Sequence, residues 1–182
     1  MPVSGRGSLP FTLVHGESLV ATASLAMEQA GAQLVDFTVE WVTVREAERA
    51  LVLHDPLCPL TPPDFLVAAV EAAETGEVVV GCRPVTDTLK QRTSGFVGDT
   101  VDREAHVVVT SPVVLPAPVV AGLAEPPDMS DFALLVHRLR EVAVVRLLEA
   151  PPLGRRISQE ADLAALEALS EATRQAHRST AP

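Results

Sequence analysis

The stretch EVVVGC at residues 77–82, followed by PVTDTLK at 84–90, decides the fold expected for this chain. Residues 77–82 form a short apolar run, which is typical of a strand buried on both faces of a parallel sheet. The turn after it carries hydroxyls, a carboxylate and Lys90, the only lysine of the sequence. Ligands of open α/β sheets bind beyond the carboxyl ends of strands, so this turn is a candidate binding element.

An earlier stretch, ALVLHDPLCP at residues 50–59, has the same arrangement. An apolar strand leads into His54 and Asp55, and a proline-rich turn follows. Thr61 is the expected N-cap of the next helix. The sequence therefore predicts a β-α-β unit with a right-handed crossover, which brings the carboxyl ends of both strands to one edge of the sheet. Its elements are a strand at 50–55, a helix at 62–75 and a strand at 77–82.

The remaining elements follow from hydrophobic periodicity and turn residues. Helical spacing predicts a helix from Glu17 to Ala30, and alternation around Val39 and Trp41 predicts a strand at 33–44. Residues 86–106 are polar and contain glycines, which predicts a projecting β-hairpin arm. Ser94-Gly95 or Gly98-Asp99 would close this arm. Residues 1–10 are aperiodic and are expected to be poorly ordered.

The C-terminal part of the chain predicts helices and short strands. A short helix follows Pro118, and a second helix is expected to begin at Ser130 as its N-cap. Residues 142–150 read as an apolar strand, residues 155–158 as a short strand, and Ser158 as the cap of a terminal helix. No repeat or linker divides the sequence, so residues 1–182 are expected to form a single domain.

Composition excludes several classes of function. The formal charge of −10 and the pI near 4.9 argue against nucleic-acid or anionic-membrane binding, which needs clustered basic residues. No apolar run reaches the ~18 residues of a membrane span. Cys58 and Cys82 show no metal-ligand spacing, and the start of the sequence does not resemble a secretory signal, so we expect a cytoplasmic protein with reduced thiols and no metal centre.

Five motifs match those of one protein family in both their order and their spacing. The sequence resembles the 2-C-methyl-D-erythritol 4-phosphate cytidylyltransferases of the non-mevalonate isoprenoid pathway from about Ala50 to the C-terminus. The pairing of PVTDTLK with VDR is the most specific part of the resemblance. The motifs are His54-Asp55-Pro56-Leu57-Cys58-Pro59, Pro84 to Lys90, Val101-Asp102-Arg103, Ser111-Pro112-Val113, and Arg155-Arg156-Ile157-Ser158 before Asp162-Leu163.

The resemblance implies a fold and an acceptor site. The fold is a three-layer, nucleotidyltransferase-like (Rossmann-like) α/β sheet with a projecting β-arm at 86–106, truncated on its N-terminal side. The arm would build a homodimer, with its arginine reaching across to the partner. In the family, the turn that contains the His-Asp pair also carries an arginine. Cys58 stands at that position here, so one positive charge that would bind phosphate is missing. The implied phosphosugar-binding residues are Asp55, Thr88, Arg103, Ser111 and Arg156.

The nucleotide side of the resemblance is weaker. The family has a Gly-rich loop with an arginine and a following Pro-Lys, which hold the triphosphate of CTP. Residues 5–11 retain little of this loop, and Leu9 stands where the lysine is expected. The segment 31–53, which would read the base, is shorter than in the family. Phosphoryl-type transfer depends on positioning and charge stabilisation, so we expect little or no cytidylyl transfer and assign no catalytic residue.

Three functional hypotheses follow from this asymmetry. The first is a degenerate homologue with a partial phosphosugar site and a dimer arm. The second is an active enzyme with an incomplete N-terminus, using Mg²⁺ with CTP. The third is a non-catalytic dimerisation or regulatory partner that forms heterodimers with a complete homologue. Local roles compete with all three, because Asp55 and Thr88 also suit turn formation and Arg103 also suits an exposed ion pair.

Overall fold

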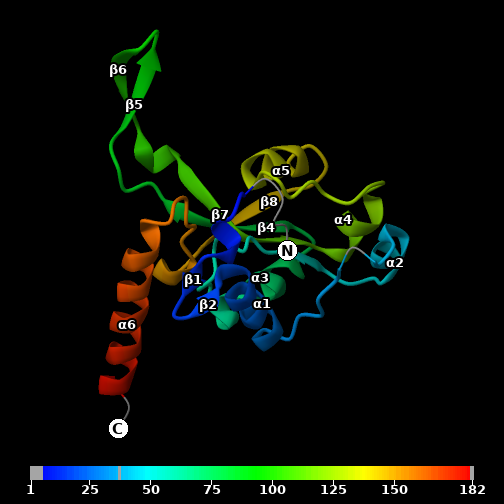
Figure 1. Cartoon of the computed structure of the whole chain (residues 1–182). Helices are drawn as coiled ribbons and strands as arrows, with labels where there is room; N and C mark the ends of the chain where they lie inside the picture. The colour runs from blue at the N-terminus through cyan, green and yellow to red at the C-terminus, as the bar shows by residue number, and fades with distance from the viewer. Residues whose placement is uncertain (1–5, 37, 181–182) are drawn as a thin grey trace.

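A four-stranded sheet forms the centre of the computed structural model, which describes residues 6–36 and 38–180 (Figure 1). β7 runs antiparallel to both β3 and β4, and β8 runs parallel to β4. β3, β4 and β8 therefore point the same way, and their carboxyl ends lie at one edge of the sheet, as predicted. The strands, in sheet order, are β3 (Leu51–Leu53), β7 (Val107–Leu115), β4 (Val78–Pro84) and β8 (Val145–Glu149).

Helices cover both faces of this sheet, which confirms the predicted three-layer α/β architecture. Side chains of β4 alternate between the faces, because successive residues of a strand point in opposite directions. Val78 and Val80 pack in the cluster that contains Phe132 and Leu135 of α5 (Phe132–Leu139), next to α4 (Ala117–Gly122). Val79 packs against Ala69 and Ala73 of α3 (Pro63–Ala73), and α1 (Leu19–Gln29) lies against α3.

The two ends of the chain meet in a separate apolar cluster beside the sheet. The 3-10 helix η1 (Leu9–Phe11), the short strands β1 (Leu13–Val14) and β2 (Glu17–Ser18), and α6 (Asp162–Thr180) surround it. Its buried members are Val14, Leu19, Leu57, Ile157, Leu163 and Leu166. Residues 1–5, for which poor order was expected, lie outside the described residues. Residues 6–10 do not fit that expectation, because Pro10 and the Arg6 side chain are buried.

A two-stranded arm extends away from the sheet (Figure 1). It consists of β5 (Leu89–Thr93) and β6 (Phe96–Val101), which pair with each other only. Ser94 and Gly95 have φ of 50° and 88°, the positive values that a tight two-residue hairpin turn requires. The predicted hairpin is therefore confirmed, and of the two predicted closures Ser94-Gly95 is the one that forms. The 3-10 helix η2 (Arg103–Ala105) follows it.

The strand predicted at 33–44 is wrong. Trp41 instead begins the helix α2 (Trp41–Glu46), and no strand is assigned to the described residues of this stretch. The Trp41 ring packs on the core cluster under α4, and its Nε1 donates to the carbonyl of Leu123 at 3.1 Å. Packing of the Trp41 ring therefore favours the helix over the predicted strand. Val39, which the alternation placed on the same buried face as Trp41, is exposed. Phe37, part of the predicted alternation, lies outside the described residues.

Three predicted helix starts also differ from the structure. Pro62 occupies the N-cap position of α3, and the Thr61 hydroxyl donates to the carbonyl of Cys58 instead. Asp131, rather than Ser130, caps α5, because its carboxylate can accept from two backbone N–H groups. Residues 155–158 form no strand, and α6 begins at Asp162 rather than after Ser158. The 3-10 helix η3 (Pro152–Gly154) precedes this segment.

None of the described helices is long and apolar enough to cross a membrane.

Gly81 of β4 allows the close approach of β7 at Ser111. A Cβ atom at position 81 would lie 2.7 Å from the Ser111 carbonyl oxygen, and the β4–β7 register shifts between Val80 and Cys82. We predict that Gly81→Ala lowers the free energy of unfolding by about 2 kcal/mol, because backbone must move to admit the methyl group. Urea unfolding measures this.

Gly122 provides the matched control. A Cβ at this position meets nothing within 4 Å, and its φ is not positive. Gly122→Ala should change the free energy of unfolding by no more than about 0.5 kcal/mol, or raise it, because alanine favours helix. Equal stabilities of the two variants would contradict the packing argument at Gly81.

Candidate functional site

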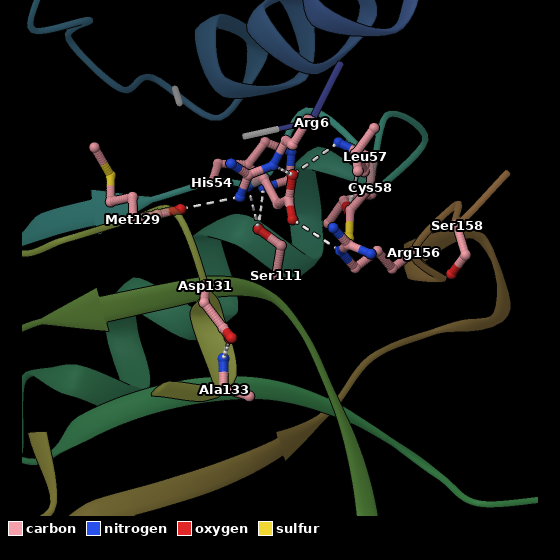
Figure 2. A network of polar contacts seen from close by, with 12 residues as sticks. Arg6, His54, Leu57, Cys58, Ser111, Met129, Asp131, Ala133, Arg156 and Ser158 are labelled. Atoms are coloured by element: carbon pink, nitrogen blue, oxygen red, sulfur yellow. Dashed lines mark hydrogen bonds and ion pairs between the residues drawn. The ribbon is translucent and has the colours of Figure 1, made fainter. Parts of the chain in front are cut away.

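The carboxylate of Asp55 is the centre of a buried polar cluster at the carboxyl end of β3. Figure 2 shows Arg6, Ser111 and Arg156 of this cluster. Its Oδ1 lies 2.9 Å from Nε of Arg6, and its Oδ2 lies 3.0 Å from Nε of Arg156. The backbone N–H of Leu57 also donates to Oδ1 at 3.0 Å, as an Asx-type turn does. Asp55 is only 1% exposed, so this carboxylate is stabilised by protein groups rather than by water.

The two arginines come from opposite ends of the chain. Arg6 precedes η1, whereas Arg156 lies between η3 and α6. Arg6 also donates from Nη2 to the carbonyl of Met129 at 3.0 Å, and its guanidinium lies 6.0 Å from the centroid of the Phe132 ring. Its side chain is 3% exposed. Arg6 therefore joins the N-terminal segment, the end of β3 and the start of α5.

Ser111 and His54 form the other side of the cluster. The Ser111 hydroxyl accepts a hydrogen bond from the backbone N–H of Asp55 at 2.9 Å and lies 2.6 Å from Nδ1 of His54. Burial lowers the pKa of His54 to about 4, although the charge of Asp55 acts in the opposite direction. His54 is therefore neutral at pH 7. Among residues 6–36 and 38–180, no hydrogen-bond partner lies within reach of two buried polar atoms, Nε2 of His54 and the hydroxyl of Thr110.

The cluster carries an excess of positive charge in a strongly acidic chain. Burial raises the pKa of the Cys58 thiol, and the charge of Asp55 raises it further, so Cys58 is neutral. The charges of the three side chains Arg6, Asp55 and Arg156 then add up to +1. Arg156 is the member that reaches solvent, since its side chain is 36% exposed while that of Arg6 is 3% exposed. An anion could meet this edge of the cluster.

The five predicted site residues fall into two groups. Asp55, Ser111 and Arg156 meet in the cluster. Thr88 is exposed before β5, and Arg103 donates from Nη1 to the carbonyl of Thr86 at 2.6 Å. Arg103 lines a groove of about 410 Å³ at the base of the arm. The described side chains that bond to Asp55 do not line this groove. The other residues of the groove are Cys82, Pro84, Val85, Thr86, Glu104, His106, Val107 and Glu149.

Arg6 is the residue of the cluster that was not predicted from the sequence. It lies in an aperiodic segment, and neither spacing nor a strong motif marks it. The available signal was indirect: the turn after β3 carries Asp55 but no cation, so burial of this carboxylate requires a basic residue from elsewhere in the chain. Arg6 is the only lysine or arginine among residues 1–44.

No metal centre is formed by the described residues themselves. In residues 6–36 and 38–180, no three His, Cys, Asp or Glu side chains gather as ligands for an ion.

Comparison of the fold with solved structures defines the class of protein first. The model matches 2-C-methyl-D-erythritol 4-phosphate cytidylyltransferase from Thermus thermophilus with a TM-score of 0.65 and 22% identity, over 94% of this chain and 100% of that chain. A 4-diphosphocytidyl-2C-methyl-D-erythritol synthase from Anaerococcus prevotii gives a TM-score of 0.65 at 12% identity, over 92% and 95% of the two chains. The chain therefore has a nucleotidyltransferase-like α/β fold.

Sequence comparison then specifies the relationship. The chain is 28% identical over 167 residues to the cytidylyltransferase of Rhodococcus jostii, covering 90% of this chain and 73% of that protein. It is 30% identical over 125 residues to a bifunctional IspD/IspF enzyme of Nitratidesulfovibrio vulgaris, covering 65% of this chain and 31% of that enzyme. No family model matches. The protein is thus related to the 2-C-methyl-D-erythritol 4-phosphate cytidylyltransferases, which confirms the resemblance, although it spans only about a third of the bifunctional enzyme.

We predict that His54 makes the protein less stable in acid. Because its pKa is about 4 in the folded state and about 6.5 when unfolded, the unfolded chain binds more protons between these values. This contribution is absent above pH 6.5 and reduces the free energy of unfolding by about 3 kcal/mol at pH 4. Urea unfolding at pH 7, 6, 5 and 4 measures the decline.

His54→Asn tests the assignment, because asparagine can occupy the place of Nδ1 beside Ser111 but does not titrate. The variant should show a smaller loss of stability between pH 6.5 and 4 than the wild type. His137→Gln, at an exposed histidine of α5, is the control with which the pH dependence of His54→Asn is compared. An unchanged slope in His54→Asn would contradict the prediction.

Proposed function

We propose that this protein is a degenerate homologue of methylerythritol-phosphate cytidylyltransferase. It keeps part of a phosphosugar site and a dimer arm, and it has weak or no cytidylyl-transfer activity. The relationship to proteins of that name supports the assignment to isoprenoid precursor biosynthesis. A cytoplasmic location belongs to the same proposal, and the unbridged thiols of Cys58 and Cys82 are compatible with it.

The observation that carries the proposal is the inward orientation of Arg6. This arginine belongs to the glycine-bearing segment that resembles the nucleotide loop, yet its guanidinium is buried and bonded to Asp55. It is therefore not placed to stabilise charge on a nucleotide phosphate. Lys90, the only lysine, lies on β5 of the arm and contacts Thr100. Since phosphoryl transfer depends on positioned cations, these placements support impaired transfer.

The acceptor side is better supported than the nucleotide side. Asp55, Ser111 and Arg156 converge, and the solvent-facing part of Arg156 suits a phosphate group, because a guanidinium can donate two parallel hydrogen bonds to it. The phosphate of a phosphosugar would bind there. Its hydroxyl groups would need further donors and acceptors.

The arm would supply these groups in a homodimer. Thr88 and Arg103 lie at the base of the arm rather than in the cluster, so a second copy is the proposed source of both side chains. An isolated two-stranded hairpin is only marginally stable in water, and Phe96 and Val97 near its tip are 78% and 80% exposed. These features support an arm that packs against a partner.

Ligand binding and turnover test the function. Calorimetric titration should detect methylerythritol phosphate, and Arg156→Met should weaken that binding at least about tenfold, because it removes a charged hydrogen-bond donor. Arg146→Met, at an exposed arginine on β8, should leave binding unchanged. With CTP, Mg²⁺ and the phosphosugar together, pyrophosphate release should stay near background. Rapid turnover would contradict the degenerate assignment and support an active enzyme.

Light scattering tests the arm. The wild type should have the mass of a dimer, and Phe96→Asp should shift it toward monomer, because a charge cannot be buried in an apolar interface without cost. Val142→Asp is the matched control, since Val142 is similarly exposed but lies outside the arm. A wild-type monomer would contradict the homodimer and favour a heterodimer with a complete homologue.

A further inference from the structure

We infer that Arg6 is a positioning residue that neutralises Asp55 and thereby keeps Arg156 available for an anion. The inference rests on the proposed phosphosugar site and concerns how its positive charge is maintained. It assigns a role to a residue outside the five predicted site positions. The ligand class is a phosphate group, and inorganic phosphate is its simplest probe.

The geometry assigns different roles to the two arginines. Both approach Asp55 through Nε, at 2.9 and 3.0 Å, one on each carboxylate oxygen. Arg6 also contacts the carbonyl of Met129 and the Phe132 ring, which leaves its side chain 3% exposed. The Arg156 side chain is 36% exposed, and among the described side chains it bonds to Asp55. Arg6 is therefore fixed inside, and Arg156 presents its outer edge to solvent.

The charge balance explains why Arg6 matters at a distance from the ligand. His54 and Cys58 are neutral, so the sign of the cluster depends on two guanidinium groups and one carboxylate. With Arg6 present, the charges of Arg6, Arg156 and Asp55 add up to +1. Without Arg6, Asp55 and Arg156 would cancel each other, and a phosphate at Arg156 would face a carboxylate with no second cation. Charges inside a protein are poorly screened, so loss of Arg6 should weaken the electrostatic attraction of the cluster for phosphate strongly.

The experiment measures binding of inorganic phosphate by isothermal titration to the full chain and four variants. Arg6→Met removes the charge at similar size and should weaken binding about tenfold, because the charges of Asp55 and Arg156 then cancel. Arg6→Lys keeps the charge and should remain close to wild type. Asp55→Asn alone raises the sum to +2 and should strengthen binding.

The decisive variant is the double substitution Arg6→Met with Asp55→Asn. It restores the sum to +1 and should recover most of the phosphate affinity lost in Arg6→Met. If the role of Arg6 is purely structural, the double variant should bind phosphate no better than Arg6→Met. A second substitution in a buried network would then disrupt the site further. Thermal unfolding of every variant separates the two effects, since affinity and stability should not change in parallel.

Several outcomes would overturn the inference. These are undetectable phosphate binding by the wild type, equal binding by Arg6→Met, or no recovery in the double variant. If Arg6→Met does not fold, Arg6→Lys and Asp55→Asn still decide, because weaker binding by Asp55→Asn contradicts the charge balance. Phosphosugar binding that needs Arg156 but not the charge of Arg6 overturns this inference alone. Cytidylyl transfer by the wild type overturns the proposed function alone.

Discussion

The shared ion pair at Asp55 is the interaction on which the rest of the carboxyl edge of the sheet depends. A buried carboxylate is costly without partners, and removal of one partner from such a pair is strongly destabilising. Here the partners are Arg6 and Arg156, and the Asp55 backbone N–H is bound by Ser111. Asp55 thus joins the N-terminal segment and the segment before α6 through its side chain, and β7 through its backbone N–H. A ligand that binds at this edge must leave the buried carboxylate of Asp55 paired.

The same constraint relates stability to function. Buried ion pairs are not in general more stable than apolar replacements of the same size, so the cluster is weak support for stability as its purpose. Its excess positive charge and the exposure of Arg156 are easier to understand as features of an anion site. The resemblance to methylerythritol-phosphate cytidylyltransferases led to the prediction of Asp55, Ser111 and Arg156 as site residues, and these three side chains lie together in the structure.

Sequence reasoning predicted the β-α-β unit, the arm and the convergence of Asp55 with Ser111 and Arg156, because strong apolar runs and specific motifs carry that information. It failed where a single long-range contact decided the structure. Alternation around Val39 indicated a strand, but packing of the Trp41 ring produced α2. Arg6 had no periodicity to mark it, and its place depends on a carboxylate 49 residues away. Contacts of that kind are set by the folded core and not by local pattern.

The separation between Asp55 and Arg156 has a consequence for the nascent chain. The two residues are 101 positions apart, and β8, which pairs with β4, is also made late. Domains tend to fold from the N-terminus as synthesis proceeds, at about 5–20 residues per second. No fragment that stops before residue 156 can hold both oxygens of Asp55. During synthesis, the carboxyl edge of the sheet therefore cannot be completed before Arg156 has been added to the chain.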